Sequence, residues 1–495
     1  MVCINTIFRP SGVFRMDLFD CTEILGVLHG FNPWWSGRQN PVPEFRRLAF
    51  DACRLYLEDT SLRRAVLLSG PRRVGKTTIL LQIADQLLAR GIDPKSILYV
   101  SLDHPLIKLL NVRELLALYH SSVHPQSKET YLLFDEVQYS KEWETEIKLL
   151  VYYQPQYRIL TTGSASVVHR ERLTESGVGR WITVPIPTLS FFEFVHIRGE
   201  SAPEIPGSLR PSDLFAMTQG ERTELGQRFR DLLPLFQHYL LVGGFPETAN
   251  QKNTALCQRL LREDVVERVL KGDMTALFGV RNVNEMEKLF IYLCLHTGSI
   301  VAHKPCADAL GTTPATVANH LTLLEQANLI YRVPPVEMSG KKVLRSRNKY
   351  YLVDAALRNA VLLRGEEILT RPDEMGLIVE TTVLRHLFAY HYRDVPTIGY
   401  WRDARTGKEV DIIVQSPKYT LPFEVKYQES PRLRESSGLV AYCTLEEVDR
   451  AYWVTKQDKD FDVVRMGGLQ TEFLKVPAHI LCFLLGQAER LLWAD

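Results

Sequence analysis

Residues 64–82 constrain this chain more than any other stretch, because they join an apolar run, a glycine-bounded turn and a second apolar run with helical spacing. Within them, Gly70, four intervening residues and then Gly75, Lys76 and Thr77 match the pattern G-x-x-x-x-G-K-[ST]. That pattern requires a strand before the turn and a helix after it, and both are expected here, which disfavours a chance glycine-rich turn. The sequence therefore predicts a loop that cradles phosphate groups.

Each part of this loop has a physical task. The glycines allow successive backbone N–H groups to point inward, and the following helix presents its positive N-terminal end to an anion. We expect Lys76 to reach the β- and γ-phosphates of ATP, and the Thr77 hydroxyl to complete the oxygen shell of a Mg²⁺ ion. The nucleotide-binding residues predicted from the loop are Gly70, Pro71, Arg72, Arg73, Val74, Gly75, Lys76, Thr77 and Thr78.

A second motif, YLLFDEVQ at residues 131–138, ends an apolar run with two carboxylates. A buried parallel strand has this pattern, and ligands of open α/β sheets collect at the carboxyl ends of such strands. We expect Asp135 to hold Mg²⁺ through water and Glu136 to act as the general base. The alternative is a strand that merely ends in two solvated acids, which the upstream phosphate loop disfavours.

Strand and helix patterns alternate from residue 65 to residue 187, and repeated βα units of this length predict a parallel sheet. The stretch TTGSAS at 161–166 follows one of these strands, and it places Ser164 where a polar side chain can sense the γ-phosphate. A simple turn of small residues explains the same stretch equally well.

Composition sets the outer limits. A chain of 495 residues suggests about three domains of ~150 residues. The net charge of +1 means that any nucleic-acid surface must be a local patch. The eight cysteines lie far apart without a C-x-x-C pair, which indicates reduced thiols and no structural zinc. No apolar run approaches ~18 residues and the N-terminus lacks a signal-peptide pattern, so we expect a cytoplasmic protein with no membrane contact.

From about residue 190 helical periodicity takes over, interrupted by LVGGFPE at 241–247. The motifs GPRRVGKT, LLFDEVQ, LTTGSAS, GRWITVPIPTLSFFEF and GGFPE, in this order, resemble those of prokaryotic AAA/STAND-type ATPases that carry a restriction-endonuclease-like C-terminal domain. The resemblance covers residues 45–470. It implies that Pro246, on a helical lid, contacts the nucleotide. It also makes Arg180 a candidate arginine finger for its own or a neighbouring site, whereas an arginine that only opens a strand is the equal alternative.

Residues 281–355 have helix-turn-helix spacing, with a glycine turn at 311 between two short helical patterns. In such a module the second helix would offer Thr313, Thr316, Asn319 and His320 to a DNA groove. A basic stretch at 331–350 follows, with one acid, and its predicted phosphate contacts are Lys341, Lys342, Arg345 and Arg347. These features predict a winged helix that binds duplex or branched DNA, although a winged helix can also serve as a protein–protein spacer.

The last third of the chain carries a second constellation. Glu380 lies in a helical pattern, Asp411 in GKEVDIIV, and Glu424 with Lys426 in LPFEVKY. Residues two apart on a strand share a face, so Glu424 and Lys426 converge. Acid, acid and E-x-K on a hairpin resemble the PD-(D/E)XK nucleases, although Val410 stands where proline is usual.

In that resemblance Asp411 and Glu424 bind Mg²⁺, Lys426 holds or activates the attacking water, and Glu380 adds a ligand or orients one. The alternative is a solvated hairpin with an internal ion pair.

Together these patterns predict an α/β protein of five parts: an N-terminal extension (1–42), a P-loop AAA-type core with a parallel sheet (43–195), a helical lid (196–280), a winged helix-turn-helix (281–355) and a restriction-endonuclease-like α/β domain (356–495). The expected activity is ATP hydrolysis, with ATP and Mg²⁺ as cofactors, coupled to binding and cutting of DNA. The alternative is an ATP-gated regulator or scaffold with a silent nuclease-like domain, and a homo-oligomer is left open.

Overall fold

The N-terminal half of the chain is built on a five-stranded parallel sheet. The computed structural model describes residues 21–59, 61–126, 128–163, 180–336, 347–429 and 431–493. The strands are β1 (Ala65–Ser69), β2 (Ile97–Ser101), β3 (Thr130–Asp135), β4 (Tyr157–Gly163) and β5 (Trp181–Pro185), in the order β2-β3-β4-β1-β5. Every neighbouring pair is parallel, as the βα alternation predicts. Strands β1 to β4 are almost wholly buried, which explains their continuous apolar runs, whereas the edge strand β5 is partly exposed.

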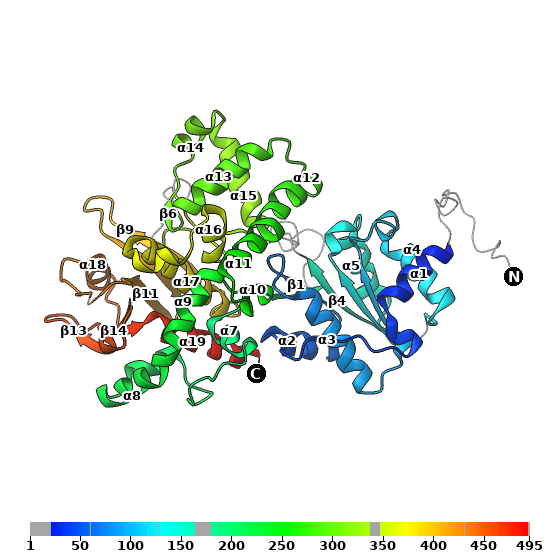
Figure 1. The fold of residues 1–495 in the computed structure, drawn as a ribbon, viewed down its shortest axis with the longest axis horizontal. Coiled ribbons are helices and arrows are strands. Elements are labelled where there is room, and N and C mark those ends of the chain that lie inside the picture. The colour runs from blue at the N-terminus through cyan, green and yellow to red at the C-terminus, as the bar shows by residue number, and fades with distance from the viewer. Residues whose placement is uncertain are drawn as a thin grey trace.

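Helices cover this sheet, which lies at the right of Figure 1. They are α2 (Ala49–Glu58), α3 (Lys76–Ala89), α4 (Val112–Ser122) and α5 (Trp143–Tyr153), with short 3₁₀ turns η3 (Pro94–Ser96), η4 (Ile107–Leu109) and η5 (Val137–Tyr139). In α5 the residues Trp143, Ile147 and Val151 are buried on one face, so the helix has the expected core side.

The segment before α2 protects the edge strand β2. It consists of α1 (Cys21–Phe31) and η2 (Pro33–Ser36). The Asn32 side chain donates to the Tyr99 carbonyl at 2.9 Å and accepts from the Tyr99 N–H at 2.7 Å. The indole N–H groups of Trp34 and Trp35 both donate to the Ile97 carbonyl, at 3.1 and 3.0 Å. These side chains satisfy the backbone of a strand that would otherwise be open to pairing.

The expected helical lid is divided between two parts of the molecule. Its elements are α7 (Phe191–Ile197), η6 (Pro211–Phe215), α8 (Gln219–Phe229), η7 (Arg230–Leu232), α9 (Leu233–Val242), α10 (Pro246–Ala249), α11 (Thr254–Leu260), the π-helix η8 (Leu261–Asp273) and α12 (Met274–Ala276). The buried apolar side chains of α7, α8 and α9 belong to the same core as those of the C-terminal helices. Near the centre of Figure 1, the ribbons of α7 and α9 lie close to the C-terminal helices. Among the described residues, α10 and η8 contact the nucleotide loop and Ile197 at the end of α7 lines the same cavity, so the lid predicted for residues 196–280 is divided rather than continuous.

A small antiparallel sheet lies beside the C-terminal part, where the Val336 N–H bonds to the Tyr400 carbonyl. Its order is β6-β8-β7, from β6 (Ser299–Ile300), β7 (Ile330–Val333) and β8 (Lys349–Leu352). It is accompanied by α13 (Val283–Leu295), α14 (His303–Leu310), α15 (Pro314–Gln326) and α16 (Ala355–Leu362). Gly311 ends α14 in a left-handed conformation (φ 69°), and the Thr313 hydroxyl caps α15, so the turn expected between the two helices is present.

The C-terminal part is a six-stranded mixed sheet in the order β13-β14-β12-β11-β10-β9. Its elements are η10 (Glu366–Thr370), α17 (Pro372–Tyr390), β9 (Thr397–Arg402), β10 (Glu409–Ser416), β11 (Tyr419–Val425), α18 (Gly438–Leu445), β12 (Arg450–Thr455), η11 (Asp458–Asp460), β13 (Asp462–Arg465), β14 (Glu472–Pro477), α19 (Ala478–Glu489) and η12 (Arg490–Trp493). Alternate strand residues pack on α17 and α19 on one face and on α18 on the other. The hairpin β10–β11 is antiparallel, as the E-x-K reading requires.

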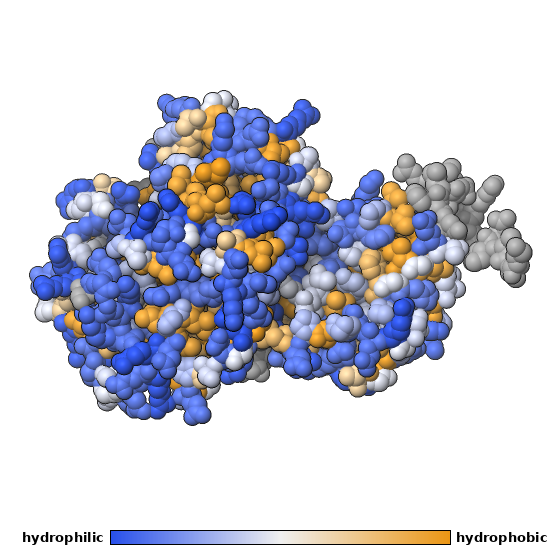
Figure 2. Space-filling model, viewed as in Figure 1, coloured by the Kyte–Doolittle hydropathy of each residue, from blue (hydrophilic) through white to orange (hydrophobic). Residues whose placement is uncertain are grey.

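The surface agrees with the composition. The face in Figure 2 is mostly hydrophilic, with separate apolar patches scattered over it. Within the described ranges, no helix combines the length and apolar character needed to cross a bilayer. The seven described cysteines all carry free thiols, in line with the predicted absence of disulfides.

Candidate nucleotide and carboxylate sites

The predicted phosphate loop connects β1 to α3 and has the expected backbone. A side chain at Gly70 would overlap the Ile186 carbonyl of the neighbouring strand, and Gly75 has a φ of 92°, which favours glycine. The buried Lys76 ammonium donates to the carbonyls of Gly70 and Pro71, at 2.8 and 2.6 Å. Burial lowers the pKa of Lys76, while the nearby Glu136 and Asp135 carboxylates oppose that shift. Lys76 is thus already held inside the loop that a phosphate would enter.

A cavity of 830 Å³ opens beside this loop. Among the predicted nucleotide-binding residues, those that line it are Arg72, Arg73, Gly75, Lys76, Thr77 and Thr78. Pro246 also lines it and lies against the loop, since a Cβ at Gly75 would be 3.8 Å from its ring. The structure therefore brings the loop and the GGFPE turn to one cavity, as the family resemblance implies.

Three hydroxyl groups surround the Asp135 carboxylate at the end of β3. It accepts hydrogen bonds from Thr77 at 2.7 Å and from Tyr99 at 3.1 Å, and Thr162 is a third donor. Burial raises the pKa of Asp135, the neighbouring Glu136 adds to the rise, and the three hydroxyl donors oppose it. The Thr77 hydroxyl and the Asp135 carboxylate thus lie together at the position where the sequence predicts Mg²⁺.

Glu136 lines the same cavity. Its backbone is left-handed (φ 55°), and its N–H donates to the Thr162 hydroxyl at 2.9 Å. A left-handed backbone is costly for a residue with a side chain and is concentrated at functional sites. The turn therefore places Glu136 on the wall of the cavity beside the phosphate loop.

The two loop arginines are paired with acids of the lid. Arg72 binds both carboxylate oxygens of Asp273, at 2.7 and 2.6 Å, and Arg73 lies 3.1 Å from Asp264 and 3.4 Å from Glu247. The two aspartates belong to η8, the π-helix, and long runs of this geometry are rare. Arg72 and Arg73 line the cavity as predicted, but they also tie the phosphate loop to α10 and η8.

Arg47 contacts the phosphate loop, although it belongs to none of the sequence motifs. It is buried, lines the cavity, and donates to the Val74 carbonyl of the loop at 2.5 Å and to the Pro187 carbonyl at 2.8 Å. Its guanidinium also pairs with the Glu193 carboxylate at 2.7 Å. Only its position in the helical pattern before β1 marks it in the sequence. Arg47 therefore fixes the loop from the side of α7.

Arg180 lies away from the phosphate loop of its own domain. Arg180 precedes Trp181, which pairs with Ala65 at the start of β1, whereas the phosphate loop follows Ser69 at the other end. A strand rises about 3.3 Å per residue, so the two ends are well over 10 Å apart. The guanidinium instead lies 5.5 Å above the Tyr152 ring. A role at a neighbouring copy stays a prediction, and Ser164 lies outside the described residues.

The GGFPE turn is fixed by Asp354, which caps α16. Asp354 accepts from the Gly244 N–H at 2.9 Å and from the Ala356 N–H at 2.9 Å. Gly243 has a φ of 76°, and a Cβ there would lie 2.6 Å from Asp354 Oδ1. The turn that carries Pro246 is therefore tied to the segment that follows β8.

Replacing Gly243 with Ala is expected to lower the free energy of unfolding by about 1–3 kcal/mol, because a left-handed backbone and a steric clash both act there. Thermal unfolding and ATP-analogue titration would measure the effect. Gly220→Ala is the matched control, since Gly220 is exposed and has open space around it. Equal unfolding of the two variants would contradict the constraint at Gly243.

The four residues predicted for the C-terminal site converge from α17, β10 and the end of β11. Lys426 Nζ lies 2.5 Å from Glu424 Oε1 and 4.0 Å from Asp411 Oδ2. Asp411 also accepts from the Val425 N–H at 2.9 Å, beside a bulge in the pairing of β10 with β9. Bulges often re-aim side chains next to functional sites. The fourth residue, Glu380, is close enough to Asp411 and Lys426 for their charges to affect its ionisation.

The negative charges of these carboxyl groups are only partly balanced by the Lys426 ammonium. Burial, together with the Asp411 carboxylate, raises the pKa of Glu380 to about 7 and that of Glu424 to about 8. Glu424 Oε2 is buried without a hydrogen-bond partner in the described structure. Like charges held out of water favour either a proton or a cation. Below about pH 7–8 protons therefore compete with any cation for these oxygens.

The donor set fits Mg²⁺ in its chemistry, because carboxylate oxygens are the ligands this ion prefers. The unpartnered Glu424 Oε2 is directly available for such a bond. In the described ranges, however, no three His, Cys, Asp or Glu side chains already converge at metal-binding distance. Lysine ammonium groups stand between the carboxylates instead. The residues Asp411 and Glu424 thus fit a metal, and Glu380 is held by other partners.

The predicted DNA contacts are only partly described. Asn319 is exposed, and Thr316 is half-buried with its hydroxyl 2.9 Å from that of Thr313. Arg347 is exposed, and its carbonyl accepts from the Tyr400 hydroxyl at 2.7 Å. Lys341, Lys342 and Arg345 lie outside the described residues. His320, which the helical pattern places on the same helix, is buried 3.8 Å from Glu285 and does not face a groove.

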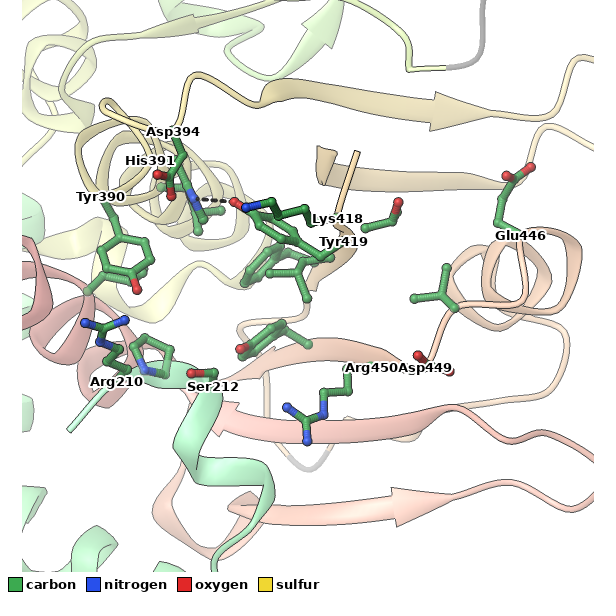
Figure 3. A pocket seen from close by; sticks show the side chains of 18 of the residues that line it. Arg210, Ser212, Tyr390, His391, Asp394, Lys418, Tyr419, Glu446, Asp449 and Arg450 are labelled. Atoms are coloured by element: carbon green, nitrogen blue, oxygen red, sulfur yellow. Dashed lines mark hydrogen bonds between the residues drawn. The ribbon is translucent and has the colours of Figure 1, made fainter. Parts of the chain in front are cut away.

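A second cavity, of 780 Å³, lies at the other end of β11 from Glu424. Figure 3 shows Tyr419 and His391 next to each other on one side of this cavity, with the Tyr419 hydroxyl 3.3 Å from His391 Nδ1. Arg210 and Arg450 lie on the opposite side. Asp394, Glu446 and Asp449 add negative charge to the same walls. Among its described lining there is no residue that the sequence predicts as functional, so this cavity is separate from both sites.

Comparison with known proteins divides the chain into three matched segments. Residues 62–195 match the family described as an AAA domain. Residues 233–367 and 375–473 match two families described as domains of unknown function, DUF8612 and DUF4143. The N-terminal domain is therefore an AAA-type P-loop ATPase domain.

Two relatives extend over most or much of the chain. An uncharacterized protein of Haemophilus influenzae is 24% identical over 394 residues, which cover 78% of this chain and 88% of the relative. The uncharacterized protein MJ1637 of Methanocaldococcus jannaschii is 23% identical over 302 residues, which cover 60% of this chain and 62% of that protein.

Similar solved structures include the RuvB Holliday junction branch migration motor of Thermotoga maritima, with 18% identity and a TM-score of 0.26 over 59% of this chain and 91% of that one. AMPPCP-bound DnaA from Aquifex aeolicus has 18% identity and a TM-score of 0.28 over 60% of this chain and 92% of that one. TM-scores of this size carry no argument about function.

Proposed function

We propose that this chain is an ATP-hydrolysing protein of the AAA/STAND type that binds DNA and cleaves it at a Mg²⁺-dependent site in its C-terminal domain. The observation that carries the proposal is the convergence of Glu380, Asp411, Glu424 and Lys426 from three elements of the fold. Their pattern resembles the PD-(D/E)XK nucleases, and the antiparallel hairpin β10–β11 has the geometry which that pattern requires.

In the ATPase domain, Lys76 would bind the β- and γ-phosphates of ATP, with Thr77 and Asp135 on the side of Mg²⁺. Support comes from the shared cavity and from the 2.7 Å contact between Thr77 and Asp135. Glu136 would accept the proton of the attacking water. Pro246 would report nucleotide occupancy, since it lies against Gly75 at the cavity wall.

In the C-terminal domain, Asp411 and Glu424 would hold Mg²⁺, and the bound ion would polarise a phosphodiester group. Lys426 would position the attacking water from the same face of the strand end, where its ammonium already contacts Glu424. Glu380 would orient the assembly from α17. The raised pKa values of the buried Glu380 and Glu424 carboxyl groups support this assignment, because carboxyl groups with perturbed pKa values concentrate at functional sites.

DNA binding rests on the small sheet and its helices. The pair α14–α15 with strands β7 and β8 has the order of elements of a winged helix. The chain leaves β7 and returns to β8 beside the C-terminal sheet, because the Val336 N–H and the Arg347 carbonyl both bond to Tyr400 on β9. A basic wing would therefore start near the carboxylate site.

Assembly into a homo-oligomer is part of the same proposal. Arg180 lies at the end of the sheet away from its own phosphate loop, so an arginine finger at this position would have to serve a neighbouring copy. In that position it would complete the neighbour's γ-phosphate site.

A second function is favoured by one observation. The carboxylates of the C-terminal site are already paired with lysines, and in the described chain no ready three-ligand metal site exists. Such a site could be silent, and the chain would then be an ATP-gated regulator or scaffold whose winged helix binds a partner.

The deciding experiment incubates the full-length protein with ATP, Mg²⁺ or Mn²⁺, and a panel of duplex, single-stranded and branched DNA. We expect cleavage of at least one duplex or branched substrate, abolished by EDTA. ATP hydrolysis measured in the same reactions shows whether the protein is folded and loaded. Active ATPase with no cleavage of any substrate would favour the regulator instead.

A further inference from the structure

Glu380 is held by the small sheet rather than by its own domain. The Tyr351 hydroxyl, on β8, donates to Glu380 Oε1 at 2.6 Å. The Lys349 ammonium lies 3.9 Å from the same oxygen, and its side chain is only 2% exposed. Lys349 and Tyr351 are two residues apart on one strand, so they share a face. That face of β8 is therefore directed at the carboxylate site.

The two parts of the molecule are in close contact around Glu380. A Cβ on Gly298, beside β6, would lie 3.1 Å from Glu380 Oε1 and 2.9 Å from the Tyr351 ring. The hydroxyl groups of Thr297 and Thr381 are 3.1 Å apart. The glycine is thus required for the close approach of α17 to the small sheet at Glu380.

Lys349 is surrounded by acids. Its ammonium is 2.5 Å from Glu409 Oε1 as well as 3.9 Å from Glu380, and it faces the Tyr400 ring at 5.2 Å. Lys426 supplies a second ammonium on the side of Asp411 and Glu424. A buried charge of this kind is stable only when it is paired, and a divalent cation entering the site would compete for the same carboxylates.

We propose that Tyr351 and Lys349 are positioning residues of the C-terminal site. Tyr351 fixes the Glu380 carboxylate toward the cation that Asp411 and Glu424 bind, and Lys349 balances Glu380 and Glu409 while that cation is absent. The site is thereby shared between β8 and the six-stranded sheet. This inference rests on the proposed metal site, but it concerns cation binding rather than DNA cleavage.

The test is Mn²⁺ binding to the full-length protein, measured by calorimetry without DNA. Tyr351→Phe removes one oxygen and should weaken Mn²⁺ binding about tenfold or more, as the loss of a hydrogen bond to a metal ligand typically does. Tyr350→Phe is the matched control, because Tyr350 is the next residue of β8 and points to the opposite face. It should leave the affinity unchanged.

Lys349 has the opposite expected effect. Lys349→Met removes a competing cation and should tighten Mn²⁺ binding, whereas Lys349→Arg keeps the charge and should restore the wild-type affinity. Thermal unfolding identifies any variant that fails to fold, and in that case Tyr351→Phe decides alone, because it changes neither charge nor packing volume appreciably. A merely structural role would not move affinity in opposite directions at neighbouring positions.

The outcomes separate this inference from the proposed nuclease activity. Mn²⁺ binding that depends on Tyr351, without DNA cleavage, upholds the inference and overturns the activity. Mn²⁺-dependent cleavage with equal affinities in Tyr351→Phe and Tyr350→Phe overturns the inference and leaves the activity standing. A wild-type protein that binds no Mn²⁺ at all overturns both.

Discussion

Replacing Glu136 with Gln is expected to leave ATP binding intact and to slow hydrolysis by about 100-fold or more, the usual contribution of a general base. The amide keeps the size of the side chain but cannot accept the proton of water. Glu136 lines the cavity beside the loop, and its backbone is fixed by the Thr162 hydroxyl, so the variant should retain the turn. Binding of an ATP analogue and steady-state phosphate release would be measured side by side.

Two further variants serve as comparisons for Glu136→Gln. Glu142→Gln is the matched control, because Glu142 is also a left-handed glutamate (φ 52°) but is exposed on the surface. It should hydrolyse ATP at the wild-type rate. Lys76→Ala should lose nucleotide binding itself, since the phosphate charges would be left uncompensated in the loop. Wild-type hydrolysis by Glu136→Gln would show that another group activates the water.

The sequence predicts the parts of this protein that depend on local pattern. The phosphate loop, its strand and its helix lie where the motif places them, because glycine spacing and apolar periodicity are properties of neighbouring residues. The hairpin that carries Asp411 and Glu424 is predicted for the same reason. Period-two alternation fixes which side chains share a face, so the convergence of Glu424 and Lys426 follows from the sequence.

Contacts between distant segments leave no such signal. Nothing in the spacing indicates that Arg72 pairs with Asp273, or that Arg47 holds the loop through Val74. The sequence of α7 to α9 has helical periodicity, from which a lid is predicted. The helix α9 nevertheless buries most of its apolar residues against the C-terminal domain. A periodic apolar face predicts burial but does not name the partner. The sequence therefore places Lys349 only in a basic stretch, although its side chain is buried among acids.

The second large effect is expected at the C-terminal site, where Asp411→Asn and Lys426→Ala should each reduce DNA cleavage by about 100-fold or more, through different losses. Asp411→Asn removes a charged metal ligand but can still accept the Val425 N–H, so the hairpin should survive while Mn²⁺ binding fails. Lys426→Ala should still bind Mn²⁺ and DNA, because it removes the group that positions the water and leaves both carboxylates in place.

Three measurements made in parallel distinguish these losses from unfolding. Cleavage, Mn²⁺ affinity and ATP hydrolysis should give one pattern for Asp411→Asn, another for Lys426→Ala and an unchanged ATPase rate in both, because the phosphate loop lies in a separate domain. Lys418→Ala is the control, since Lys418 is an exposed lysine at the far end of the same hairpin. If Lys426→Ala cuts DNA as well as the wild type does, the ammonium has no part in the chemistry. Only a wild-type protein that cuts no DNA at all would mark the lysine-held carboxylates as a silent site.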